Sequence, residues 1–503
     1  MTHPLSAAGP WLLAAALVGT AGPAPARAQA QAQAQAEPQL PREGGSPLPA
    51  PGAGIFQSGQ NPLLGGVPSG QATPGTLALS LADAVARGLA RNLGIVLGEQ
   101  ARLSAAGGRW QALSGVLPSA ALRISQAREE INLQEFGFPV PPGESPIIGP
   151  FDVSAVHLGV SLPVFDYAAI QGARAGGAAE AAAGHSFQDV RDLVVYTVSS
   201  LYLQAVTASA RIDAARAQLA TAQALYDRAA TMKQAGIVAG IEVLRAQVQL
   251  QSQQQRVIFY ENERAKARLA LVRAIGLPLA QEVQLTDQGS YVPAEAATLE
   301  SALQLAYQSR EDLQAALALV RVAEASRQAA IGTGLPSVRV NADIGRSSNA
   351  WDSLLGTYAV TAAVTVPLFQ GGRVHGRLLQ ADAQLQQQRA QVEDLRARIE
   401  FEVRSALLDV RAADERVGVA RTAADLADEQ LVQAQDRFGA GVASNIEVVQ
   451  AQEALATATE NYISALFAHN LAKLSLARAT GTAAEWRGVR GGAPSTTGQD
   501  GRR

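Results

Sequence analysis

The sequence predicts an α+β protein made of two similar halves, each with a pair of long strands followed by a long helical hairpin. Short sequence motifs recur in the same order about 205 residues apart. Four segments alternate apolar and polar residues with a period of two, and two stretches of more than 100 residues contain no proline. Because recurrence at a fixed spacing indicates repeated structural units, these observations predict two internal repeats.

The recurring motifs also locate a difference between the two halves. They lie at Leu117-Pro118 and Leu335-Pro336, at 163–165 and 367–369, and at 236–247 and 441–452. The first motif recurs after 218 residues, and the other two recur after 204 and 205 residues. The first half is therefore expected to hold about 14 extra residues between its two strands.

The N-terminus resembles a secretory signal. Residues 11–19 form a short apolar core, and Ala26-Arg27-Ala28 is a small-x-small cleavage sequence. The absence of cysteine excludes an N-terminal lipidated cysteine, so the exported protein is not expected to be a lipoprotein. We divide the chain into a signal peptide (1–28), a low-complexity segment (29–78), repeat 1 (79–278), a linker (279–298), repeat 2 (299–482) and a C-terminal tail (483–503).

Composition argues against several classes of function. The formal net charge of −3 gives no basic excess, so nucleic acid is not an expected partner. The five histidines are scattered, cysteine is absent, and no phosphate-binding loop or metal-ligand spacing occurs. The sequence therefore predicts neither an enzyme nor a protein that holds a cofactor or a metal.

Strands are predicted at about 120–130, 152–163, 337–346 and 357–367. In the first of them Leu122 and Ile124 alternate with Arg123 and Ser125, and the other three follow the same pattern. Such alternation suits a barrel strand with lipid outside and water inside. It also suits an antiparallel sheet with one solvated face, so the strands alone leave both interpretations open.

Helices account for most of the other residues in both halves. A first helix is predicted from Ser80, a good N-cap residue, to about Ser114. The proline-free residues 373–438 would span roughly 100 Å as a single helix. Its apolar residues step mostly by threes and fours, as in a coiled coil, at Val374, Leu378, Ala381, Leu385, Val392, Leu395 and Ile399. A second helix follows Gly441 and ends near Ala479, so each half is expected to form an antiparallel hairpin.

The strands are the predicted route across a membrane. After the signal, no apolar run approaches the roughly 18 residues that a membrane helix requires. Four strands cannot close a barrel, because open edges in lipid leave backbone groups unpaired at a cost of several kcal/mol each. Three copies would supply twelve strands, so a homotrimer is expected.

Four sequence motifs, taken in order, resemble the outer membrane factor family, the TolC-like exit ducts of bacterial efflux and type I secretion. The match covers about residues 79 to 482. Its most specific parts are 81–92 (LADAVARGLARN), 366–373 (VPLFQGGR) and the two turns beginning at Gly236 and at Arg437.

The resemblance implies a trimer in which a twelve-stranded outer-membrane β-barrel, with four strands from each chain, continues into a twelve-helix periplasmic barrel of coiled-coil hairpins. It implies passive conduction of a substrate delivered by a periplasmic adaptor protein and an inner-membrane transporter of the RND, ABC or MFS type. Outer-membrane lipid is the further expected partner. Drugs, metals, polypeptides and polysaccharides all remain compatible as substrates.

The hairpin turns, at 236–241 and 439–446, are the candidate docking sites for the adaptor, because the resemblance places them at the periplasmic mouth. The docking candidates are Gly236, Ala239, Gly441 and Ser444. Ser444 is positioned to cap the returning helix, whereas Ala239 lacks a capping hydroxyl. Any helical hairpin favours glycine and serine in its turn, so a purely structural role is the alternative.

The candidate constriction is formed by residues on the returning helices. The resemblance assigns the pore-facing pair to Glu447 and Gln450, one helical turn apart, and the corresponding pair in the first half is Glu242 and Arg245. A ring of Glu447 carboxylates would attract cations, and Arg245 could hold a neighbouring helix by an ion pair. Solvated charges on a helix face are the alternative interpretation.

Two other classes of protein compete with the channel. A periplasmic coiled-coil adaptor or scaffold would have one hairpin inserted in a small β-domain, whereas this sequence predicts two hairpins with a strand pair before each. An exported enzyme would need a convergent set of titratable groups. Trp351 and Tyr358, beside the second strand connection, are candidates for an interfacial aromatic belt, although packing in a loop explains them equally well.

Overall fold

The structure is a computed structural model, which describes residues 61–485 apart from 73, 138, 140, 142, 288–290 and 294–296. All of these residues belong to one compact unit, Ala50–Arg503. The predicted signal peptide at 1–28, residues 29–60 of the low-complexity segment and residues 486–503 of the tail lie outside the described residues.

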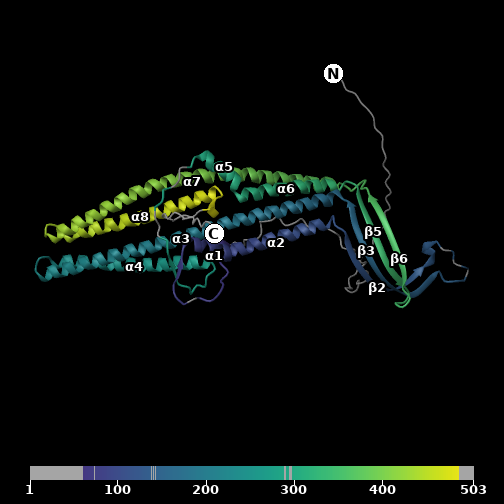
Figure 1. Cartoon of the computed structure of the whole chain (residues 1–503), viewed down its shortest axis with the longest axis horizontal. Helices are drawn as coiled ribbons and strands as arrows, with labels where there is room; N and C mark the ends of the chain where they lie inside the picture. Colours follow the sequence, from purple (N-terminus) through teal and green to yellow (C-terminus); the bar gives the residue numbers. More distant parts are fainter. Residues whose placement is uncertain are drawn as a thin grey trace, which may run out of the picture. The chain divides into compact units, whose positions relative to one another are not determined.

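The chain follows the order helices, strand pair and helical hairpin twice (Figure 1). Up to residue 285 the elements are β1 (Leu77–Leu79), α1 (Leu81–Arg91), α2 (Leu93–Ser114), β2 (Ser119–Asn132), β3 (Ile147–Phe165), α3 (Tyr167–Gln234), α4 (Gly240–Ala274) and β4 (Val283–Leu285). After it they are α5 (Leu299–Ser309), α6 (Glu311–Gly332), β5 (Ser337–Ser348), β6 (Leu355–Thr365), α7 (Arg373–Gly439) and α8 (Asn445–Ala479). Short 3-10 helices lie at Pro62–Leu64, Leu133–Phe136 and Ala483–Glu485.

The four long strands form one antiparallel sheet in the order β2-β3-β5-β6. Leu122, Leu158, Ile344 and Tyr358 are register partners across all four strands, and each is more than 40% exposed. The opposite face carries polar side chains, among which His157 Nδ1 lies 2.5 Å from Asp343 Oδ1. The sheet therefore has one exposed apolar face and one polar face, as the alternation predicts.

The extra residues predicted for the first half lie only partly in the loop between its two strands. The β2–β3 connection spans 133–146, and the β5–β6 connection spans 349–354. The strands of the first half are also longer, because β2 and β3 have 14 and 19 residues against 12 and 11 in β5 and β6. The β6 strand ends at Thr365, before the predicted 367, where Pro367 has no N–H to donate.

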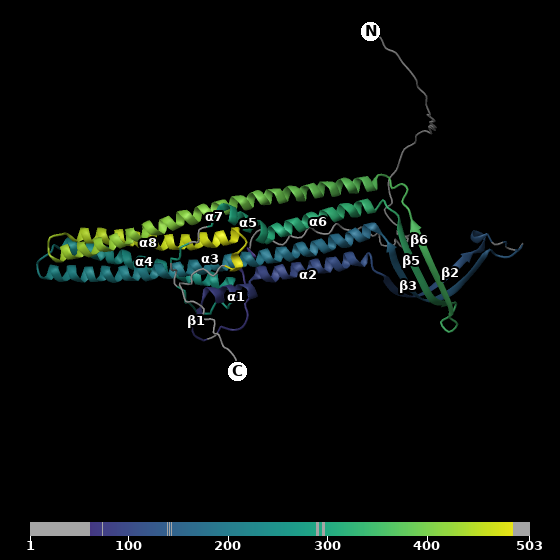
Figure 2. The same ribbon diagram turned by 45° about the horizontal axis from the view of Figure 1, so that its top comes forward.

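The helices run away from the sheet, and their hairpin turns lie at the opposite end of the bundle (Figures 1 and 2). The two long helices, α3 and α7, have 68 and 67 residues, and each returns as a helix of 35 residues. Of the predicted stripe on α7, Leu385, Val392, Leu395 and Ile399 are buried, whereas Val374, Leu378 and Ala381 near the sheet are only partly covered. The core is accordingly a series of clusters along the helices.

The prediction that no apolar run long enough for a membrane helix follows the signal is wrong. An 18-residue window of α3 has a mean hydropathy of 1.3, so by length and composition alone this helix could cross a membrane. Within the structure 44% of the window is buried. Val194, Val198 and Tyr202 of α3 are completely buried in a cluster with residues of α1 and α4, so the apolar character of α3 serves the helical core.

The predicted first helix is interrupted at Asn92. Its predicted start is correct, because Ser80 and Asp83 form a reciprocal capping box. At Asn92 the backbone becomes extended, and the buried side chain accepts a hydrogen bond from Gly94 N (2.8 Å). Its amide donates to the carbonyl oxygens of Leu63 (2.7 Å) and Ala274 (2.9 Å). Asn92 thus ends α1, caps α2 and joins both to distant segments.

A buried group of charges connects α3 to the helices of the second half. Arg310, only 3% exposed, binds the carboxylate of Glu402, and Arg478 Nη2 lies 2.6 Å from Asp189 Oδ1. Burial raises the pKa of the nearby Asp192 carboxyl to about 6, because Arg478 compensates its charge only in part and Asp189 opposes it.

Candidate functional site at the hairpin turns

The two hairpin turns have the same backbone geometry. Gly236 and Gly441 have φ values of 75° and 74°, in the left-handed region that favours glycine. In the first turn Ile237 N donates to Met232 O (2.9 Å), and in the second Val442 N donates to Arg437 O (3.1 Å). These bonds close the C-terminal ends of α3 and α7 in the manner of a Schellman motif.

The four predicted docking residues, Gly236, Ala239, Gly441 and Ser444, are all exposed. The prediction that the Ser444 hydroxyl caps α8 is wrong, because Ser444 is the N-cap residue but its side chain makes no cap hydrogen bond. The Glu447 N–H, which such a hydroxyl would bind, donates to the Ser444 carbonyl oxygen instead (3.2 Å). The turns also expose apolar side chains, namely Ile237, Ile241, Leu244, Val442 and Ile446.

The four predicted constriction residues occupy the first two turns of α4 and α8. Arg245 pairs with Glu242 on its own helix (2.8 Å), and its ion pair with a neighbouring helix stays a prediction. Glu447 lies 3.5 Å from Arg437 across the second turn, and Gln450 is exposed. The Asn445 amide donates to the Glu242 carbonyl oxygen (3.1 Å), so the two turns of one chain are in direct contact.

A polar connection that the sequence analysis did not find joins the two hairpins near these turns. The carboxylate of Glu453 on α8 accepts hydrogen bonds from three side chains of α4, which are Gln249 (2.8 Å), Gln253 (3.4 Å) and Arg256 (2.7 Å). Burial opposes the charge of Glu453, but the bonds from Gln249 and Arg256 outweigh it and lower the pKa. We call Glu453 and these three α4 residues the α4–α8 latch.

An ion pair farther from the turns and an apolar cluster nearer to them also hold α8 against its neighbouring helices. Two helical turns farther along α8, Glu460 Oε1 lies 2.7 Å from Arg211 Nη2 of α3. Nearer the turns, α3, α7 and α8 share an apolar cluster of Leu225, Leu431, Ala434, Phe438, Val448 and Ala451. The seven-residue spacing of Glu453 and Glu460 places both on one face of α8 and was a sequence signal for a helix contact.

A four-stranded sheet with an exposed apolar face, continuing into two long helical hairpins, is the architecture of the TolC-like outer-membrane channels. The profile of the outer membrane efflux protein family matches residues 149–277 and 302–482, which together exceed half of the chain. The chain belongs to this family, a family of transport channels and not of enzymes.

Individual relatives are more distant. The chain is 23% identical over 312 residues to the pyoverdine export outer membrane protein OpmQ of Pseudomonas putida, covering 58% of this chain and 63% of that protein. It is 22% identical over 314 residues to the alkaline protease secretion protein AprF of Pseudomonas aeruginosa, covering 61% and 65%. The match thus spans less than two thirds of either relative.

The fold is shared over a larger part of the chain. The outer membrane channel CmeC of Campylobacter jejuni superposes with a TM-score of 0.70, covering 86% of this chain and 94% of CmeC at 17% identity. The regions that the family profile leaves out, including α1, α2 and β2, therefore do not prevent a nearly complete structural match.

Proposed function

We propose that the protein is an outer-membrane channel that passively conducts substrates from a periplasmic adaptor and an inner-membrane pump to the exterior, and that its hairpin turns form the gate. The observation that carries the proposal is the sheet. Its apolar face exposes many large hydrophobic side chains, which favours contact with lipid over contact with water. Its strands lead directly into the helical hairpins. A periplasmic adaptor, the alternative, would leave this face without a function.

The proposed assembly is a homotrimer with a twelve-stranded barrel and a twelve-helix tunnel. Among the described residues β2 and β6 are edge strands, each hydrogen-bonded on one side only, and edges in lipid must be paired. The helices also support contact between copies of the chain, because α4 and α7 each carry a stripe of exposed apolar residues. The stripes consist of Ile241, Leu244, Val248 and Ile258 on α4 and of Phe401, Leu408, Val419 and Leu426 on α7. Packing of α4 against α7 of the next copy would cover both stripes.

The proposed organisation of the chain follows from this assembly. Residues 79–278 and 299–482 are two repeats joined by the linker 279–298, and residues 1–28 are a signal that directs export. The exposed Tyr358 would lie among lipids. Trp351, whose indole N–H donates to Gln126 Oε1 (3.3 Å), would lie at the membrane interface.

At the proposed gate, three copies of Glu447 form a ring of carboxylates that favours cations, with Gln450 one turn farther along α8. The Glu242–Arg245 pair borders the same opening from α4. Gly236, Ala239, Gly441 and Ser444 are the proposed contacts of the adaptor, and the exposed apolar residues beside them would add to that contact. The inner-membrane partner is a transporter of the RND, ABC or MFS type.

Both efflux and type I secretion fit the proposed substrate route. OpmQ is named for pyoverdine export and AprF for protease secretion. A small molecule or a polypeptide is thus the proposed cargo, and the pump selects it.

Conductance across a planar lipid bilayer tests the proposal. The wild-type protein should form a cation-selective pore of low conductance, and Glu447→Ala should reduce its cation selectivity. Arg245→Ala should raise cation conductance, because it removes a positive charge from the border of the proposed opening. A wild-type protein that forms no pore contradicts the channel, whereas a pore whose conductance and selectivity both variants leave unchanged contradicts only the assignment of the gate.

A further inference from the structure

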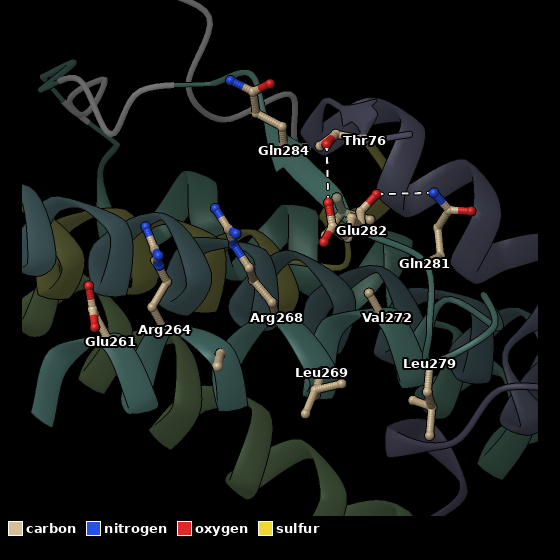
Figure 3. A pocket seen from close by; sticks show the side chains of 12 residues that line it. Thr76, Glu261, Arg264, Arg268, Leu269, Val272, Leu279, Gln281, Glu282 and Gln284 are labelled. Atoms are coloured by element: carbon tan, nitrogen blue, oxygen red, sulfur yellow. Dashed lines mark hydrogen bonds between the residues drawn. The ribbon is translucent and has the colours of Figure 1, made fainter. Parts of the chain in front are cut away.

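A cavity of about 590 Å³ lies far from the hairpin turns, between the C-terminal half of α4, strand β4 and the residues before β1 (Figure 3). Its polar lining includes Arg264 and Arg268 of α4, Glu282 and Gln284 at β4, and Thr76. Neither the constriction nor the docking residues border this cavity. Its side chains are therefore not explained by the proposed channel function.

The two arginines are unpaired within the described part of the chain. Figure 3 shows their guanidinium groups pointing to the same side of α4, one helical turn apart. Among the residues that the structure describes, neither side chain makes a hydrogen bond or an ion pair, and Arg268 Nε is buried without a partner. Burial and the adjacent positive charge of Arg264 both lower the pKa of Arg268.

The carboxylates that line the cavity form no hydrogen bond with these donors. Glu261, at the end of the row beside Arg264, is bound to Arg216 (2.8 Å). Glu282 accepts a hydrogen bond from the Thr76 hydroxyl (3.4 Å). Glu282 and Asp213 act on Arg268 only through a longer-range attraction. Two unpaired guanidinium groups on one helix face repel each other, and a buried unpaired donor carries a desolvation cost.

We propose that this cavity is a binding site for a small oxyanion, either inorganic phosphate or a small carboxylate. Guanidinium groups present rigid forks of N–H donors that match two oxygens of such an anion. Gln284 of β4 also lines the cavity and carries a side-chain amide, which Figure 3 shows pointing away from the two guanidinium groups. Leu269 and Leu279 point away from the guanidinium groups, so the geometry selects a compact anion and not one that carries an acyl chain.

Binding there would connect two parts of the fold. Arg264 and Arg268 belong to the first hairpin, whereas Gln284 belongs to the small parallel sheet of β1 and β4 that precedes the second half. An anion in the cavity, which both line, would join α4 to that sheet and would stabilise the folded protein by mass action. The inference does not depend on conduction, since it concerns a site outside the proposed pore.

Thermal unfolding of the full protein in detergent tests this site, with inorganic phosphate titrated against chloride at constant ionic strength. Phosphate should raise the unfolding temperature of the wild-type protein and of Arg411→Gln, a matched loss of an exposed arginine on α7. Arg268→Gln should weaken the apparent affinity at least about tenfold, because it removes charge-assisted hydrogen bonds. Arg264→Gln should weaken it in the same direction and serves if Arg268→Gln does not fold.

Acetate, titrated in the same way, identifies the carboxylate form of the ligand. A response to either anion that is lost in the Arg264 and Arg268 variants supports the site. An equal response of Arg268→Gln, Arg264→Gln and the wild-type protein would mean adventitious binding only and would overturn the proposal. No response of the wild-type protein to either anion would overturn it as well, as expected if a carboxylate of a neighbouring copy fills the cavity.

Discussion

The α4–α8 latch should control the opening of the hairpin turns. Glu453 is its only acceptor, and its three donors all belong to α4, so changing this one side chain weakens every latch contact between the two hairpins. Glu453→Gln keeps the shape of the side chain and removes its charge. If opening separates the hairpins of one chain, this substitution should favour the open state.

The magnitude follows from the exposure of the latch. The side chains of Arg256 and Glu453 are 37% and 40% exposed, so their ion pair contributes only about 0.5–1 kcal/mol. Each glutamine hydrogen bond adds roughly 0.5–1.5 kcal/mol in net terms, and the amide of the variant retains part of this. A loss of about 1–2 kcal/mol per chain would shift the closed-to-open equilibrium by a factor of roughly 5–30.

Single-channel recording measures this shift as the fraction of time that the pore is open. The matched control is Glu393→Gln, which removes the same charge from a pair within α7 (2.9 Å to Arg396) that does not join the hairpins. Glu453→Gln should raise the open fraction and Glu393→Gln should not. Equal open fractions in Glu453→Gln and the wild-type protein, or an equal rise in both variants, would refute the reasoning.

Three further predictions concern stability, measured by thermal or urea unfolding. Asp192→Asn should stabilise the protein by about 1–2 kcal/mol above pH 6, after allowance for solvent screening. The raised pKa of Asp192 means that its ionisation opposes folding above pH 6, so the gain should shrink as the pH falls from 6 towards 4, and a gain independent of pH would contradict this. Asn92→Ala should cost about 1–3 kcal/mol through loss of the cap and two buried hydrogen bonds, and an unchanged midpoint would contradict that role. Gly441→Ala should destabilise by about 1–2 kcal/mol because its φ is positive, whereas Gly418→Ala, in open space within α7, should be neutral or stabilising.

Features that depend on nearby residues were predictable from the sequence. The alternation around Leu122 and Leu158 is local, and it correctly indicates which residues share a sheet face. The positive φ at Gly236 and Gly441 likewise follows from the need to reverse the chain between two helices.

Features that depend on distant partners were not predictable. Asn92 ends α1 because its amide meets Ala274, which lies 182 residues away, and no residue beside Asn92 signals this break. Arg256 and Glu453, the charged pair of the latch, are separated by 197 residues. At Ser444 the local rule was misleading, because a backbone carbonyl took the N–H that the hydroxyl was expected to bind.

Closure of the sheet by three copies is the central claim, and disulfide cross-linking between its two edge strands tests it most directly. The chain contains no cysteine, so introduced pairs supply the only thiols. Leu122→Cys in β2, combined in turn with cysteine at Tyr358, Val360 or Ala362 of β6, should give linked species of two and three subunits and none larger on oxidation in the membrane. Leu158→Cys in the inner strand β3, combined with the same β6 positions, should give no linked subunits. Absence of any β2–β6 link, or a series that extends beyond three subunits, would contradict the account.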